Sequence, residues 1–537
     1  MLLFVTAMVI SMAIVPIMIR LAPHVGMVDL PDPRKVHTTP IPRVGGIGIV
    51  IGAIIPVIFW LPFEPIITSY IFGCLVLLVF GVWDDSCELG HYVKFVGQFV
   101  AVLPAVYYAD LYVATLPLIG DIPEFIGKIF TVIAVVGMIN ATNHSDGLDG
   151  LAGGLSILSL AGIGYLMYMV DDTAMVFLVV SVMGGVFGFL RFNSHPAKVF
   201  MGDGGSQFLG FSLGFLVIVL TQKSNPALSP ALPLLILGLP VVDIIAVFYL
   251  RISGGMNWFK ATRNHIHHRL LDLGFTHYES VIIIYLIQML LIICSIFFMY
   301  EYDWLILSVY FTVVVTIFVL LTTSERSGFK LKRKSGSSVI DVFFNEKLKS
   351  KLLMRFLGGY VVFAISLIFL SISFAIDSVP ADIGYLSLGL FLASIAVFVL
   401  LRSQLRSFTK LVLYVTAALI VYLDYIYLHF GNPVNVELEK VIYILMAIAA
   451  VLIIKFDDAL DFAMSPLDYL MAIIVVIAFT VFNMSPDNND YGNYILKMIL
   501  LFYGCEIIER SNVKAFKFAT IASLSALMVL ASRSLLL

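Results

Sequence analysis

Residues 140–154 read NATNHSDGLDGLAGG and stand between two apolar stretches, 127–140 and 151–170. The segment places two carboxylates, Asp146 and Asp149, at the start of the second stretch. Uncompensated carboxylates are costly beside hydrocarbon, and they make sense there if a cation and a phosphorylated ligand occupy the site. The stretch therefore predicts membrane-spanning helices with a polar binding site at their ends.

The composition excludes an ordinary soluble protein. Of the 537 residues, 61% are hydrophobic and only 12% are charged. Apolar stretches long enough to cross a bilayer recur along the chain, and their length favours helices over the alternating strands of a membrane barrel. We predict an all-α, polytopic transmembrane protein with about 11 helices in the first part and about seven more in a C-terminal extension.

The distribution of basic residues predicts sidedness and a linker. We expect a first domain at 1–325, a basic linker at 326–354 and a further transmembrane domain at 355–537. Lys and Arg gather in the loops after the odd-numbered spans, which predicts that these loops are cytoplasmic and that the N-terminus is outside. The expected spans of the first part are 2–21, 44–62, 66–83, 94–110, 127–140, 151–170, 173–191, 205–221, 231–251, 281–300 and 303–323.

The loops after the first and third spans carry charged clusters. Lys35 and His37 in the first loop are either topology determinants or phosphate contacts. The later loop opens with Asp84 and Asp85, and Lys94 follows at the start of the next span. Adjacent carboxylates repel one another unless a cation is near. A solvated helix cap is one interpretation, and a metal or base role beside a phosphate-binding lysine is the other.

In the segment quoted first, Asp146 and Asp149 lie on one face of a helical turn. The helix N-terminus that follows supplies positive potential for an anion. The amides of Asn140 and Asn143 can offer carbonyl oxygens to a hard cation. His144 reads as a surface residue. Capping alone would need one aspartate, so the set favours a binding site.

The loop after the seventh span reads FNSHPAKVFMGDGGS over 192–206. Asp203 stands between glycines and has little side-chain crowding around it in the sequence, as an oxygen ligand to Mg²⁺ should. Asn193 is a further polar candidate in the same loop. A simple turn is the alternative.

The loop after the ninth span contains His265, His267, His268 and Arg269. Three histidines in four residues suggest zinc at first sight, but no matching Cys or Glu set accompanies them. Imidazoles beside arginine suit a diphosphate instead. Taken together, the loops of one membrane face predict phosphoryl transfer from a soluble cytoplasmic donor to a lipid acceptor.

These motifs resemble the polyprenyl-phosphate N-acetylhexosamine-1-phosphate transferases. DLPDPRKVHTTPIPRVGG, VWDD, NATNHSDGLDGLAGG, HPAKVFMGDGGS and HIHHRL fit the family in order over about residues 1–325. The resemblance therefore implies that 1–325 is the catalytic domain. The resemblance implies that a lipid phosphate attacks the β-phosphate of a UDP-sugar and releases UMP, with Mg²⁺ as cofactor and Mn²⁺ as the alternative. It also implies the first membrane step of cell-envelope polysaccharide synthesis in a bacterial inner membrane, with GlcNAc as the favoured sugar.

The resemblance also implies roles for individual residues, while it leaves open whether an aspartate forms a covalent intermediate or the lipid phosphate attacks directly. The expected partners are a UDP-N-acetylhexosamine, a polyprenyl phosphate and membrane lipids, without nucleic acid, and a homodimer is a further candidate. His144 departs from the family, which usually has an apolar residue there. The expected roles are catalytic for Asp84, Asp85 and His265, metal-binding for Asn143 and Asp203, and substrate-binding for Lys35, Lys94, Asp146, Asp149, Asn193, His267, His268 and Arg269.

The competing class is a transporter or lipid-handling membrane protein. A transporter would show charged residues or broken helices near the bilayer midplane. In this sequence the polar residues gather in loops, and Asp243 is the main charge inside a predicted span of the first part. In the extension, Lys455 with Asp457, Asp458 and Asp461 forms the one polar cluster, which reads as interfacial. An enzymatic front half joined to a lipid-handling back half is a third possibility.

Overall fold

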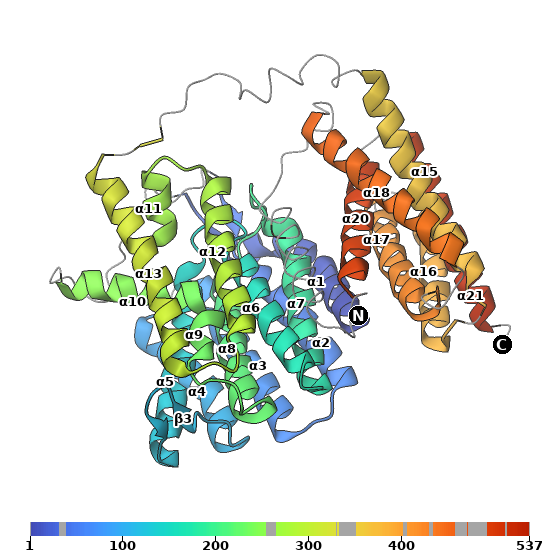
Figure 1. Ribbon diagram of the computed structural model, residues 1–537. Coiled ribbons are helices and arrows are strands. Elements are labelled where there is room, and N and C mark those ends of the chain that lie inside the picture. Colours follow the sequence, from blue (N-terminus) through green and yellow to red (C-terminus); the bar gives the residue numbers. More distant parts are fainter. Residues whose placement is uncertain are drawn as a thin grey trace. The chain divides into compact units, whose positions relative to one another are not determined.

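The chain divides into two compact units, each a bundle of helices (Figure 1). The first unit comprises Met1–Arg333 with Ser465–Ile474, and the second comprises Lys334–Met464 with Val475–Leu537. The computed structural model describes residues 2–31, 39–87, 89–253, 265–328, 330–331, 351–377, 379–400, 405–428, 433–456, 470, 491–510 and 513–535.

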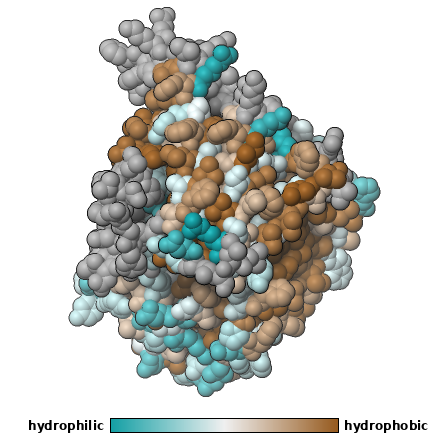
Figure 2. Space-filling model, turned by 90° about the vertical axis from the view of Figure 1, so that its right-hand side faces the viewer, coloured by the Kyte–Doolittle hydropathy of each residue, from teal (hydrophilic) through white to brown (hydrophobic). Residues whose placement is uncertain are grey.

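Long apolar helices dominate both units. Among the described residues, twelve helices are long and apolar enough to cross a membrane. The strands in these ranges are two residues long and form two antiparallel pairs. Hydrophobic side chains cover much of the face shown in Figure 2, as expected for helices in lipid. The prediction of an all-α, polytopic membrane protein is confirmed.

In the first unit α8 is the central helix, and it packs against α2, α3 and α5. The apolar residues of α8 are buried by these neighbours. The long helices are α1 (Leu2–Leu21), α2 (Gly45–Trp60), α3 (Pro65–Cys87), α4 (His91–Tyr107), α5 (Glu124–Ser145), α6 (Leu151–Tyr168), α7 (Thr173–Asn193), α8 (Gly202–Val219), α10 (Gly238–Ser253), α12 (His277–Phe297) and α13 (Asp303–Arg326). The shorter elements are η1 (Ala22–Val25), β1 (Val28–Asp29), β2 (Ile41–Pro42), β3 (Thr115–Leu116), β4 (Gly120–Asp121), η2 (Leu220–Ser224), α9 (Leu232–Ile236) and α11 (Ile266–Asp272).

The predicted single span at 231–251 is wrong, because the structure breaks it into α9 and α10. Pro240 lies in the first turn of α10, where its missing N–H costs nothing, but it cannot continue a helix from before. Two side chains supply hydrogen-bond donors at the break. The Ile236 carbonyl accepts hydrogen bonds from Ser159 Oγ and Gln288 Nε2, both at 2.8 Å. α10 then runs across the direction of the long helices (Figure 1). The carbonyl that the break frees is therefore satisfied by side chains of neighbouring helices.

The second unit holds ion pairs between its helices. Asp424, the first residue of η4, is buried and pairs with Lys497 of α20 at 2.7 Å. Tyr414 Oη of α17 donates to Glu506 Oε2 of α20 at 2.7 Å. The predicted cluster at Asp457 lies outside the described residues. The helices are α15 (Lys351–Ala375), α16 (Ala381–Leu400), α17 (Leu405–Leu423), η4 (Asp424–Leu428), α18 (Pro433–Phe456), α20 (Tyr491–Arg510) and α21 (Val513–Leu535).

Candidate active site

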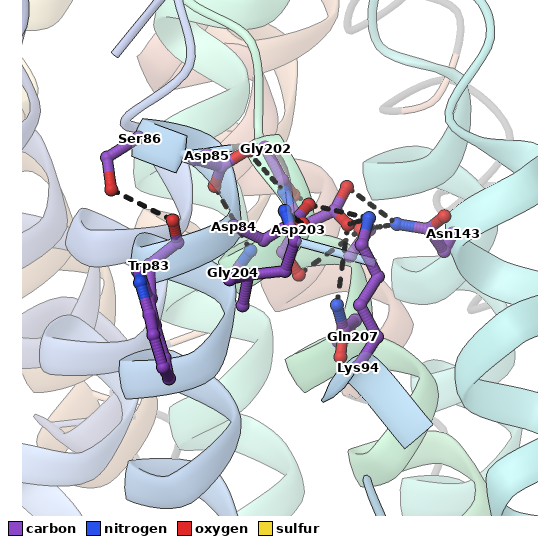
Figure 3. A network of polar contacts seen from close by, with 12 residues as sticks. Trp83, Asp84, Asp85, Ser86, Lys94, Asn143, Gly202, Asp203, Gly204 and Gln207 are labelled. Atoms are coloured by element: carbon purple, nitrogen blue, oxygen red, sulfur yellow. Dashed lines mark hydrogen bonds and ion pairs between the residues drawn. The ribbon is translucent and has the colours of Figure 1, made fainter. Parts of the chain in front are cut away.

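Four helices of the first unit bring predicted site residues into one ionic network (Figure 3). Lys94 Nζ of α4 lies 2.6 Å from Asp84 Oδ2 of α3 and 2.7 Å from Asp203 Oδ2 of α8. Asn143 of α5 donates its amide to Asp203 Oδ1 at 3.1 Å and to Ser206 Oγ at 2.8 Å. Residues from three separate predicted loops therefore meet at a single point.

Asp85 holds the start of α8. Its two carboxylate oxygens accept hydrogen bonds from the backbone N–H groups of Asp203 at 3.0 Å and Gly204 at 3.3 Å. The glycines here bring helices together, because a Cβ on Gly81 of α3 would lie 2.2 Å from Gly204 Cα. Asp85 thus fixes the position of Asp203, and Gly81 and Gly204 let α3 and α8 touch behind it.

A chain of amides continues the network below Asp203, and its two glutamines were not predicted. Gln207 Nε2 lies 3.5 Å from Asp203 Oδ2, Gln98 Nε2 lies 3.4 Å from Gln207 Oε1, and Asn140 donates to Gln98 Oε1 at 2.8 Å. Gln98 follows Lys94, and Gln207 follows Asp203, by one helical turn. That i, i+4 spacing is the signal that could have found them, since it places each glutamine on the face of the charged residue.

The donor set suits a hard divalent cation. Asp84, Asp203 and Asn143 carry carboxylate and amide oxygens, the ligand type that Mg²⁺ takes. Lys94 now lies between the two carboxylates and supplies the positive charge that such a pair requires. The residues present therefore fit the expected cofactor, and their roles as its ligands stay a prediction.

The turn between α5 and α6 is held by other parts of the first unit. Asp149 Oδ2 lies 2.6 Å from His195 Nδ1 and accepts the backbone N–H of Ala197 at 3.0 Å. His277 Nε2 of α12 lies 3.1 Å from the Asp149 backbone carbonyl. The predicted substrate-binding carboxylate is thus bound to protein groups. His195 and His277 were missed as its partners, and nothing in the sequence pairs them with it.

Asp149, His195 and His277 are close enough for a metal, with ligand atoms within 4.8 Å of one another. However, the two imidazole rings stack at 4.1 Å with an interplanar angle of 19°, and His195 Nδ1 and His277 Nε2 already have Asp149 oxygens as partners. Asn193 Oδ1 accepts the backbone N–H of Gly150 at 2.9 Å in the same turn. The group functions as a clamp on the turn rather than as a metal site.

The two aspartates of this turn differ in protonation. Burial, with the carboxylates of Asp203 and Asp149 nearby, raises the pKa of Asp146 to about 7. Burial acts in the same direction on Asp149, but the hydrogen bonds from His195 and the Ala197 N–H outweigh it and hold that pKa below its ordinary value. Asp149 is therefore ionised at neutral pH, whereas Asp146 is partly protonated there.

The predicted histidines form a cluster of rings. His265 is 7% exposed, and its ring lies 5.6 Å from that of His144 and 5.7 Å from that of His267, at interplanar angles of 24° and 12°. The rings of His267 and His268 are 4.2 Å apart. A Cβ on Gly147 would lie 2.2 Å from His267 Nε2, so this ring packs against the turn between α5 and α6. His144 is exposed, as expected of a surface residue, and its ring packs against that of His265.

Arg269, the last predicted substrate contact of this group, is held by α13. Its Nε and Nη2 donate to the two carboxylate oxygens of Glu325 at 2.7 and 2.8 Å, and Nη2 also lies 3.2 Å from Thr322 Oγ1. A bidentate pair of this kind fixes the guanidinium plane. The remaining predicted contact, Lys35, lies outside the described residues, as does His37.

Comparison with known proteins gives a consistent family. The glycosyl transferase family 4 model matches residues 67–221. A probable undecaprenyl-phosphate N-acetylglucosaminyl 1-phosphate transferase of Bacillus subtilis (strain 168) is 34% identical over 333 residues, which are 61% of this chain and 93% of that protein. The undecaprenyl-phosphate alpha-N-acetylglucosaminyl 1-phosphate transferase of Salmonella typhi is 31% identical over 275 residues, 49% of this chain and 74% of its own. The corresponding protein of Haemophilus influenzae is 32% identical over 282 residues, 50% and 78%. With its sequence motifs, its helical membrane fold and these relatives in agreement, the chain belongs to glycosyl transferase family 4.

Proposed function

We propose that the protein transfers N-acetylhexosamine 1-phosphate, with GlcNAc as the favoured sugar, from a UDP-sugar to undecaprenyl phosphate and releases UMP. The names of the relatives support both the acceptor lipid and the sugar. The observation that carries the proposal is the network in which Lys94 lies between Asp84 and Asp203 with Asn143 alongside. Phosphoryl transfer needs this combination of hard oxygen donors and a cationic side chain.

In the proposed reaction an oxygen of the lipid phosphate attacks the β-phosphorus of the UDP-sugar. The new P–O bond joins the lipid to the sugar phosphate, and the bond from the β-phosphorus to the bridging oxygen breaks so that UMP leaves. Mg²⁺, held by Asp203 and Asn143 with Asp84 beside them, would neutralise charge on the phosphates. Lys94 contributes positive charge at the same point, and Asp85 keeps Asp203 in place through the backbone of α8.

The environment of the paired aspartates favours direct attack by the lipid phosphate. Both oxygens of Asp85 accept backbone N–H groups of α8. Asp84 accepts the Leu89 N–H at 2.7 Å and binds Lys94. A carboxylate whose lone pairs are engaged in this way is a poor nucleophile.

The proposal is tested with purified full-length protein, radiolabelled UDP-GlcNAc and undecaprenyl phosphate, in Mg²⁺ or in EDTA. We expect labelled lipid only with Mg²⁺, and a loss of at least about a hundredfold in Asp203→Asn. Asp121→Asn, an exposed aspartate of β4, is the matched control and should keep wild-type transfer. Wild-type protein that forms no labelled lipid with UDP-GlcNAc or UDP-GalNAc would contradict the proposal.

Exchange of labelled UMP into UDP-GlcNAc separates the two routes. A covalent sugar-phosphate enzyme would support exchange without any lipid acceptor, because the first half-reaction would be complete. Direct attack requires undecaprenyl phosphate for exchange, and this is the expected result. Exchange without lipid that disappears in Asp84→Asn would replace the direct route by a covalent one.

We further propose that the site faces the cytoplasm across a bacterial inner membrane and that the N-terminus is outside. The asymmetry of Lys and Arg between the loops supports this orientation. Cys87 is exposed at the end of α3, close to Asp84, whereas Cys74 and Cys505 are buried. A membrane-impermeant maleimide should therefore label Cys87 in inside-out vesicles and leave it unlabelled in right-side-out vesicles. Cys87→Ser identifies any label on other cysteines, and the reverse result would invert the orientation.

A further inference from the structure

A buried carboxylate–imidazole pair joins α10 to α11 beside the proposed active site. Asp243 Oδ2 lies 2.7 Å from His265 Nδ1, and Asp243 Oδ1 accepts the backbone N–H of Ile266 at 2.8 Å. The side chains of His265 and Asp243 are only 8% and 10% exposed. Neither contact was predicted, although Asp243 stood out as a charge inside an apolar stretch.

The surroundings of Asp243 strengthen this pair. A small cavity next to it is lined mostly by apolar side chains, among them Leu151, Leu155 and Ile284. An ionised carboxylate in such a place is costly unless it is paired and hydrogen-bonded. His265 and the Ile266 N–H supply those partners, so the imidazole and the carboxylate hold one another in a fixed orientation.

His265 also stacks with two other histidine rings. The ring centroids of His144 of α5 and His267 of α11 lie 5.6 and 5.7 Å from its own. Burial, with His268 nearby, lowers the pKa of His267 to about 3, so that ring is neutral. A positive charge on His265 would therefore face the carboxylate of Asp243 and a neutral His267 ring, with His144 and His268 as the other titratable neighbours.

We propose that Asp243 is a positioning residue for His265: it keeps a proton on Nδ1 and so leaves Nε2 as the ring nitrogen that meets a phosphate oxygen of the nucleotide-sugar. The inference rests on the proposed transferase function and deepens it. A ring with protons on both nitrogens can donate from Nδ1 to Asp243 and from Nε2 to the phosphate, and Asp243 balances the charge of that form. The bond to Asp243 is thus part of how the protein stabilises the departing UMP.

Asp243→Asn isolates this role, because an amide has the shape of the carboxylate. Its oxygen can still accept the Ile266 N–H, which preserves the start of α11, while its NH₂ group then faces His265 Nδ1. Two donors repel there, so the ring can no longer carry protons on both nitrogens. We expect kcat for transfer from UDP-GlcNAc to fall by at least about tenfold, with KM changed less than about threefold.

His265→Asn provides the second arm. Asparagine reaches the position of Nδ1 and can donate to Asp243, but it has no group at the position of Nε2. It should keep the unfolding temperature near that of the wild type and lose kcat to a similar extent. Wild-type kcat in His265→Asn would overturn the proposal.

The double variant decides between positioning and simple structural support. If Asp243 acts through His265, Asp243→Asn should change kcat less than about twofold in the His265→Asn background. Equal losses in both backgrounds, or wild-type kcat in Asp243→Asn, would overturn the proposal. Asp272→Asn, an exposed carboxylate at the end of α11, controls for loss of charge. Failure of the proposed function itself would be distinct, because the wild-type protein would then be inactive.

Discussion

Lys94 lies between two carboxylates, and removing its charge should make the protein depend on a divalent cation. In Lys94→Met the hydrophobic stem stays, but Asp84 and Asp203 lose the ammonium group that lies 2.6 and 2.7 Å away. The two carboxylates, one on α3 and one on α8, would then repel one another. A cation that binds both should offset this repulsion.

The structure sets the size of the effect. Removing one partner of a fully buried ion pair costs about 3–5 kcal/mol, and an exposed pair contributes about 0–1 kcal/mol. The side chains of Lys94, Asp84 and Asp203 are 28%, 8% and 24% exposed, so the site lies between these limits and we expect a loss of about 2 kcal/mol. A cation at a hundred times its Kd restores about 2.7 kcal/mol, which is enough to compensate.

Thermal unfolding in detergent, with and without MgCl₂, measures this dependence. Lys94→Met should unfold at lower temperature than the wild type in EDTA and should gain more from Mg²⁺ than the wild type does. Lys128→Met is the matched control, because Lys128 pairs with Glu124 at 2.5 Å at the opposite end of α5. Equal Mg²⁺ responses in the wild type, Lys94→Met and Asp203→Asn would refute the reasoning.

Three further predictions concern the surroundings of the site. The folded-state pKa of Asp146, about 7, lies above the ordinary carboxyl value, so its contribution to stability falls as pH rises from about 4 to 7. Asp146→Asn should therefore unfold at higher temperature than the wild type at pH 8 in EDTA, and the gap should close toward pH 4. The pH dependence that Asp149 contributes has the opposite sign, because its folded-state pKa is lowered. Asp149→Asn should be less stable than the wild type at pH 7 by about 1–3 kcal/mol, for the lost hydrogen bonds, and should approach it below about pH 4. Gly81→Ala would put its Cβ 2.2 Å from Gly204 Cα, so it should lower the free energy of unfolding by about 1–3 kcal/mol and abolish transfer. Gly137→Ala, which has nothing within 4 Å of its Cβ, should behave as the wild type.

Much of the fold could be predicted from the sequence, because hydrocarbon imposes long apolar helices and sends polar residues to their ends. The same rule brought Asp84, Lys94, Asn143 and Asp203 to one predicted face. The exception is the break at Leu237. Two prolines seven residues apart indicate a helix break there, whereas the length and hydropathy of the stretch predict one span. Its repair by Ser159 and Gln288 depends on packing between distant helices, which no local pattern records.

The site was harder to predict, because the partner of a polar side chain is set by tertiary packing. Lys94 and Asp203 lie 109 positions apart, and Arg269 and Glu325 lie 56 apart. The sequence marked Lys94 and Arg269 as similar phosphate contacts. Only the structure shows that Arg269 is held in a bidentate pair on α13.

The hydrogen-bond partner of a polar side chain distinguishes side chains that a substrate can bind from side chains that hold the fold. Backbone N–H groups bind Asp85 and help to bind Asp149, and such donors cannot move away when a ligand arrives. Lys94 is different, because its partners are two carboxylates that a divalent cation can satisfy instead. Once a cation occupies those oxygens, the flexible ammonium group is free to contact a phosphate. If Lys94 contacts a phosphate as predicted, that contact and the observed ion pairs would be two states of one residue, and Lys94 would couple the binding of metal to the binding of nucleotide.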